Sequence, residues 1–158
     1  MKYYTVFIIG FLFSCSGTPP LVLNEEEPIE IEYAFNDASV SPEYHRSYTI
    51  SIDNSEVSIS VDSYGDILAA ENHSIDATQF AELIETINMA NLASGKNTPD
   101  EPCDGGTGES LRIKESGAEV YNGYFDHCAD HAPASMGDIG VVIDAIHAIV
   151  PNLSDLLE

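Results

Sequence analysis

The chain has 158 residues, a length typical of one domain that buries about two-thirds of its unfolded surface. It carries 27 acidic residues against five lysines and arginines, for a formal net charge of −22. This charge repels nucleic-acid phosphates and anionic lipid head groups, so we expect no nucleic-acid partner. Because 44% of the residues are hydrophobic and follow clear patterns, an intrinsically disordered chain is excluded.

The strong acidity has two further consequences. Self-repulsion keeps such a domain soluble and monomeric while it destabilises the compact state. Divalent cations could be partners of so acidic a chain, but a saline habitat explains the composition more simply than a specific cationic ligand. We therefore expect a monomer that gains stability as salt screens its charges.

Residues 1–14 have the form of a signal peptide. Lys2 gives a positive start, and the run from Tyr3 to Phe13 is almost wholly apolar. That run is much shorter than the roughly 20 residues of a membrane-spanning helix and fits the apolar region of an export signal. Its end resembles the signal peptides of bacterial lipoproteins, which place a large apolar residue, a small residue and then cysteine at the cleavage site; Leu12, Ser14 and Cys15 fill these positions.

The resemblance implies that Cys15 carries palmitate and other acyl chains after cleavage and anchors the protein to a membrane. Two or more chains hold a protein firmly where a single chain does not. Ser16, rather than aspartate, after the cysteine implies the outer membrane of the cell envelope. The alternative is an ordinary secretory signal cleaved near Ser16 and Gly17. We thus expect a signal peptide at 1–14, a lipidated flexible tether at 15–28 and one domain at 29–158.

Alternation of apolar and polar residues predicts the strands of the first half. Turn residues Asp53-Asn54-Ser55 and Tyr64-Gly65-Asp66 separate three of them. The expected strands are Ile29 to Phe35, Tyr48 to Asp53, Val57 to Asp62 and the short Ile67 to Ala70.

Two helices and a second hairpin are expected in the rest of the chain. Asp76 and Gln79 have the spacing of a capping box before a helical apolar stripe that ends near Leu92 to Gly95. A hairpin turning at Ser116-Gly117 follows. The last helix begins at a second capping-box pattern, Ser135 to Asp138, and stops at Pro151.

These elements predict an α+β fold in two layers: an antiparallel sheet with two helices packed on one face. Hairpin and helix recur, which suggests a ββα-ββα pseudo-repeat whose two hairpins join edge to edge. From Tyr48 to Leu153 the order of elements and cysteines resembles uncharacterised domains of secreted and lipid-anchored bacterial proteins. That resemblance implies no activity.

Cys103 and Cys128 flank the second hairpin and remain after Cys15 is acylated. In an oxidising compartment two such cysteines usually pair, so we expect a disulfide. The alternatives are free thiols or a zinc site that also uses His127 and His131. The spacing of these four residues lacks the paired layout of zinc folds.

Two polar loops supply weak candidates for metal ligands, although we expect no metal and no cofactor. His127 and His131 would share one face of a helical turn. Asp104 and Glu109 lie beside Gly105-Gly106, and carboxylates on a glycine-rich loop suit calcium. The calcium-loop spacing is absent, and a solvated loop is the simpler interpretation.

No nucleophile elbow, zinc-protease motif or phosphate-binding loop occurs in the sequence. We therefore expect a non-catalytic, lipid-anchored envelope domain that binds a protein or glycan partner. Two alternatives stay open: a cation-binding envelope domain for calcium or zinc, and a hydrolase with an unrecognised site.

Overall fold

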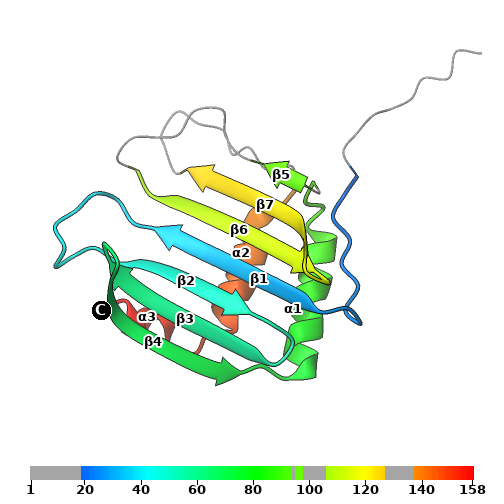
Figure 1. The fold of residues 1–158 in the computed structure, drawn as a ribbon, viewed down its shortest axis with the longest axis horizontal. Coiled ribbons are helices and arrows are strands. Elements are labelled where there is room, and N and C mark those ends of the chain that lie inside the picture. Colours follow the sequence, from blue (N-terminus) through cyan, green and yellow to red (C-terminus); the bar gives the residue numbers. More distant parts are fainter. Residues whose placement is uncertain (1–18, 94, 98–105, 127–136) are drawn as a thin grey trace, which may run out of the picture.

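The computed structural model describes residues 19–93, 95–97, 106–126 and 137–158. Within these ranges the chain has an α+β fold, and its strands form one sheet in the order β4-β3-β2-β1-β6-β7-β5 (Figure 1). Six strands pair antiparallel, and β5 pairs parallel with β7. The strands are β1 (Ile29–Asn36), β2 (Ser47–Ile52), β3 (Glu56–Ser63), β4 (Asp66–Ser74), β5 (Gly95–Asn97), β6 (Gly108–Glu115) and β7 (Ala118–Asp126).

The helices are α1 (Ala77–Met89), α2 (Ile139–Ala148) and the short α3 (Leu153–Leu156). Figure 1 shows α1 and α2 behind the same side of the sheet. Their apolar residues belong to the same buried cluster as the alternate residues of the strands. No helix in the described ranges is long and apolar enough to cross a bilayer.

The start of α1 confirms the predicted capping box. The Asp76 carboxylate accepts hydrogen bonds from the backbone of Thr78 and Gln79, at 2.8 and 2.9 Å. The Gln79 side chain accepts in return from the Asp76 amide at 3.1 Å. The helix ends at Met89, slightly earlier than expected.

The second helix begins later than the sequence suggested. Asp138, rather than Ser135, is the N-cap, and its carboxylate accepts from the Val141 amide. Gly137 just before it has a φ of +109°, and a Cβ there would lie 2.5 Å from the Ala90 carbonyl oxygen. The Asp138 amide donates to that same oxygen at 2.8 Å. The start of α2 is thus held against the end of α1, which only glycine at 137 permits.

The strand order corrects one expectation. The two predicted hairpins do not join edge to edge, because β1 lies between them and pairs with both β2 and β6. A strand with two paired edges satisfies all its backbone groups inside the sheet, and β1 also buries Ile29, Ile31 and Tyr33. β4 is also longer than the expected strand, Ile67 to Ala70, and extends to Ser74.

The segment expected to be a flexible tether is partly folded onto α1. Leu21 and Leu23 are only 3% and 4% exposed. The Leu21 amide donates to the Leu92 carbonyl at 2.6 Å. Asn88 bridges the backbone of Leu23, accepting at 2.7 Å and donating at 3.0 Å. Within the described residues, the folded unit therefore already includes this stretch before β1.

Candidate functional site

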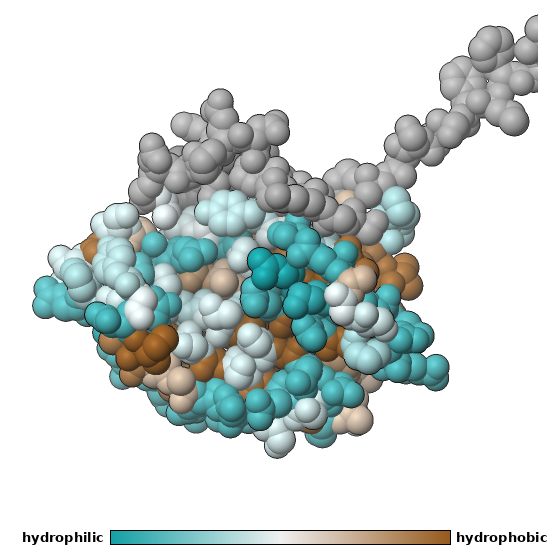
Figure 2. Space-filling model, in the orientation of Figure 1, coloured by the Kyte–Doolittle hydropathy of each residue, from teal (hydrophilic) through white to brown (hydrophobic). Residues whose placement is uncertain are grey.

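One face of the sheet carries a polar surface, which we call the open face. It is the side turned toward the viewer in Figure 1, opposite α1 and α2, and Figure 2 shows mainly hydrophilic residues there. Because successive side chains of a strand point to opposite faces, the residues between the buried ones appear on it. They include Glu30, Glu32, Ser51, Ser58, Arg112 and Lys114.

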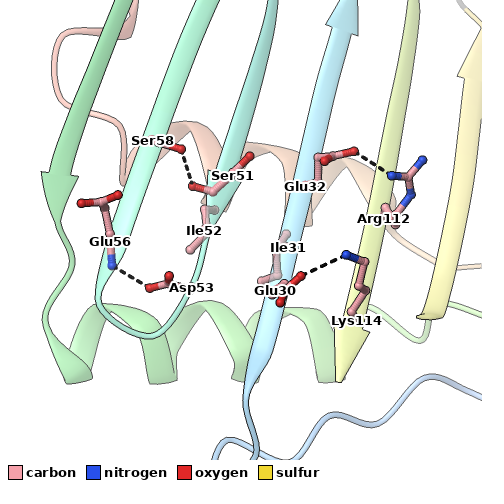
Figure 3. A pocket seen from close by; sticks show the side chains of 10 residues that line it. All are labelled: Glu30, Ile31, Glu32, Ser51, Ile52, Asp53, Glu56, Ser58, Arg112 and Lys114. Carbon is pink, nitrogen blue, oxygen red and sulfur yellow. Dashed lines mark hydrogen bonds and ion pairs between the residues drawn. The ribbon is translucent and has the colours of Figure 1, made fainter. Parts of the chain in front are cut away.

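A groove of about 200 Å³ lies on the open face. Strands β1, β2, β3 and β6 supply its walls, and the turn between β2 and β3 closes one end (Figure 3). Its charged and hydroxyl side chains are Glu30, Glu32, Ser51, Asp53, Glu56, Ser58, Arg112 and Lys114.

The wall on the β6 side holds both cations of the groove. Glu30 stands directly opposite Lys114 in the sheet register, and Glu32 opposite Arg112. Lys114 Nζ lies 3.0 Å from Glu30, and Arg112 Nη1 lies 3.1 Å from Glu32. All four side chains are 41% to 65% exposed. Such exposed ion pairs contribute little to stability, but they give both cations of this wall an acidic partner.

The opposite wall is acidic and has no cation of its own. Asp53 accepts hydrogen bonds from the Ser55 hydroxyl and from the amides of Ser55 and Glu56. These bonds hold the pKa of Asp53 below its ordinary value, so it stays ionised. No described lysine or arginine pairs with Asp53 or Glu56. The groove therefore carries excess negative charge on its β2–β3 side, with Ser51 and Ser58 as hydrogen-bonding groups.

A second polar cluster lies inside the protein. The Tyr33 hydroxyl donates to Glu109 Oε2 at 2.7 Å, and the Tyr48 hydroxyl lies 3.0 Å from His147 Nε2. The His147 ring packs edge-on against Tyr33, with ring centroids 5.2 Å apart. Tyr33 and Glu109 are 1% and 9% exposed. These groups face one another within the core, so the cluster holds β1, β2, β6 and α2 together.

Burial sets the protonation of this cluster. It raises the pKa of Tyr33 and of Tyr48, so both hydroxyls stay protonated. It also lowers the pKa of His147, although the negative charges of Glu109 and Asp144 act to raise that pKa. A neutral imidazole therefore meets a neutral phenol at this contact.

Among the predicted site residues, only Glu109 lies in the described part of the chain. It is buried in β6 and hydrogen-bonded to Tyr33 rather than displayed on a loop. In the described ranges no group of three His, Cys, Asp or Glu side chains could hold a metal. The remaining predicted residues lie outside those ranges: Cys15, Cys103, Asp104, His127, Cys128 and His131.

The groove was not anticipated from the sequence. A signal was nevertheless present, because Glu30 and Glu32 alternate with apolar residues in one strand, as Arg112 and Lys114 do in another. Opposite charges at the same spacing favour neighbouring strands with cross-strand ion pairs. That signal identifies the pairing of β1 with β6 but not the acidic wall, which needs the register of β2 and β3.

Comparison of the chain with protein-family models, with curated proteins and with solved structures finds no match.

Proposed function

We propose that this protein is a lipid-anchored binding domain of the bacterial cell envelope, held to the outer membrane by acylated Cys15. Its partner is a protein that places a positively charged side chain in the groove of the open face. The observation that carries the binding role is the acidic wall of Asp53 and Glu56, which faces a groove whose own cations are already paired with Glu30 and Glu32.

The chemistry of the groove supports binding rather than catalysis. Its polar side chains are carboxylates, serine hydroxyls and two ion-paired cations, and no histidine or cysteine of the described ranges lines it. The pKa of Asp53 is lowered by its hydrogen bonds, whereas a general acid needs a raised value. An ionised carboxylate with fixed geometry suits an ammonium or guanidinium group of a partner.

The anchor is tested by growing cells with labelled palmitate. We expect label in the wild-type protein and none in Cys15→Ala, which should also run as the uncleaved precursor. Unlabelled wild-type protein, or identical processing of the two chains, would contradict the anchor.

The groove is tested by photocrosslinking on intact cells. A photoreactive residue at the exposed Ser51 should give a discrete protein adduct, whereas the same residue at Glu82 on α1 should not. Adding Glu56→Lys to the Ser51 probe should abolish the adduct, because the new cation repels a basic partner. Equal adducts at both positions, or an adduct that is glycan rather than protein, would contradict this part of the proposal.

We also propose that the fold is organised as a two-layer ββα pseudo-repeat. Two arrangements support it: the β3–β4 pair precedes α1, and the β6–β7 pair precedes α2. In this interpretation β2 and β1 lie between the two units and join them into one sheet.

A further inference from the structure

The strand β4 forms one end of the sheet and has no neighbour beyond β3 among the described residues. Its nine residues span about 30 Å at the usual rise of a strand. Only Ala69 and His73 are partly shielded, and every other residue of the strand is exposed. Figure 1 shows α3 behind β3 and β4, with no described segment along the outer edge of β4. The strand at the other end, β5, has only three residues.

Natural proteins usually blunt an exposed edge strand. They shorten it, place charged residues or proline on it, bend it with a β-bulge, or cover it with another element. β4 has two of these features, the carboxylates of Asp66 and Glu71 and a bulge opposite Val61 and Asp62, but it contains no lysine, arginine or proline. It also displays Ile67 and Leu68, which are 63% and 49% exposed. An edge of this length with exposed apolar side chains is a template for strand addition.

The charge around this edge selects the partner. Residues 47–74, which include β2, β3 and β4, contain five acidic residues and no lysine or arginine. The only cationic candidate on β4 itself, His73, already lies 3.0 Å from Glu71. A second copy of the chain, with its own net charge of −22, is repelled from this edge. A segment carrying lysine or arginine is attracted to it.

We propose that β4 binds an extended, basic segment of a partner protein, which adds to the sheet as a further strand. Backbone hydrogen bonds along β4 would provide the affinity, with Ile67 and Leu68 contacting the partner's apolar residues and Asp66 and Glu71 its cations. This inference goes beyond the proposed function, because it concerns a different surface from the groove and does not depend on the acylation of Cys15.

The test uses the purified full-length chain and a synthetic peptide of alternating valine and lysine, equal in length to β4. Hydrogen exchange followed by NMR should show amides of β4 becoming protected when the peptide is added. A matched peptide with every backbone amide N-methylated keeps its charge but has no N–H donor on either edge, so it cannot add to β4 as a strand. It should bind at least about tenfold more weakly.

Two variants separate the edge from general charge attraction. Ile67→Lys should weaken peptide binding about tenfold or more. Met89→Lys makes the same change in charge on α1 at a side chain of nearly equal exposure, 64% against 63%. It should leave peptide binding within about twofold of wild type. Circular dichroism would show that both variants fold.

Four results would overturn the proposal. These are unchanged exchange in β4, equal binding of the N-methylated peptide, equal weakening by Ile67→Lys and Met89→Lys, and a dimer without peptide that Ile67→Lys dissociates. The last result would make a second copy the occupant of the edge.

Discussion

The hydroxyl of Tyr33 donates a 2.7 Å hydrogen bond to the carboxylate of Glu109 inside the protein, joining β1 to β6. Burial raises the pKa of Tyr33, so the hydroxyl stays protonated and acts as the donor. A buried carboxylate that loses a donor keeps its desolvation cost without the compensating bond. This contact therefore connects the two halves of the sheet at a position where substitution has a measurable effect.

Tyr33→Phe should destabilise the protein by about 1 to 3 kcal/mol, because the hydrogen bond to a charged group is lost while Glu109 stays buried. Urea unfolding followed by circular dichroism would measure the change. An unchanged free energy of unfolding would mean that the bond contributes nothing net.

Tyr121→Phe is the matched comparison on the same face of the sheet, and it should not lower the free energy of unfolding. The Tyr121 hydroxyl is buried and hydrogen-bonds to no described residue. Burial alone raises its pKa to about 12. Removing a buried hydroxyl that has no partner among the described residues should leave stability unchanged or increase it by up to about 1 kcal/mol in the same urea experiment. A loss as large as that of Tyr33→Phe would contradict this prediction.

The stability of the protein should fall as the pH drops below about 6.5, the ordinary pKa of the His147 imidazole. Burial lowers the pKa of His147 in the folded state. Above 6.5 the ring is neutral in both states; as the pH falls, the unfolded chain takes up the proton first and is favoured. The loss is complete once the pH passes the lowered folded value. The ring faces Tyr33 and Tyr48, with the charges of Glu109 and Asp144 nearby.

His147→Gln removes the titration and keeps a group that can hydrogen-bond Tyr48. Its stability should depend less on pH than that of wild type between about pH 7 and about pH 5. Hydrogen bonds also lower the pKa of Asp53 from its ordinary value of 3.8, so ionised Asp53 stabilises the fold above pH 3.8. That stabilisation is lost only at more acidic pH, as the pH falls through the lowered pKa. Parallel pH dependences of wild type and variant would show that other groups are responsible.

Local signals in the sequence predicted local structure well. The reciprocal bonds of Asp76 and Gln79 and the turns at Tyr64-Gly65 and Ser116-Gly117 are set by neighbouring residues, and the sequence predicted the capping box and both turns. The central place of β1 was not, because alternation shows which side chains are buried but not which strands are neighbours. Predicting the groove requires knowing which of the four strands that line it are neighbours.

Leu21 and Leu23 show the same limit. Two prolines before them and three glutamates after them gave the segment the composition of a linker. Their burial depends on Asn88 and Leu92, which are far away in sequence. Contacts between segments so far apart in sequence produce no periodic pattern of apolar residues in a short segment.

Leu21→Ala should therefore cost about 2 to 5 kcal/mol of stability, the usual range for a buried leucine. The neighbouring Val22 is 71% exposed, and Val22→Ala should change stability by less than about 0.5 kcal/mol. Thermal or urea unfolding of the pair would compare them. Equal, small effects of the two substitutions would show that this stretch belongs to the flexible tether.

The predicted disulfide between Cys103 and Cys128 is tested by labelling thiols in the unfolded, non-reduced protein. We expect neither cysteine to react until a reductant is added. Replacing both with serine should lower stability by about 3 to 4 kcal/mol on the chain-entropy model for a loop of about 25 residues. Two labels before reduction would exclude the bond.

Added salt should raise the melting temperature of this protein. The net charge of −22 leaves many carboxylates without a partner, and screening their repulsion favours the compact state. The same salt weakens the exposed pairs Arg112–Glu32 and Lys114–Glu30, but pairs of this kind are worth less than about 1 kcal/mol each. Calorimetric scans from about 0.01 to 1 M sodium chloride span screening lengths from about 30 to 3 Å. A melting temperature that stays flat or falls over this range would show that the ion pairs outweigh the repulsion.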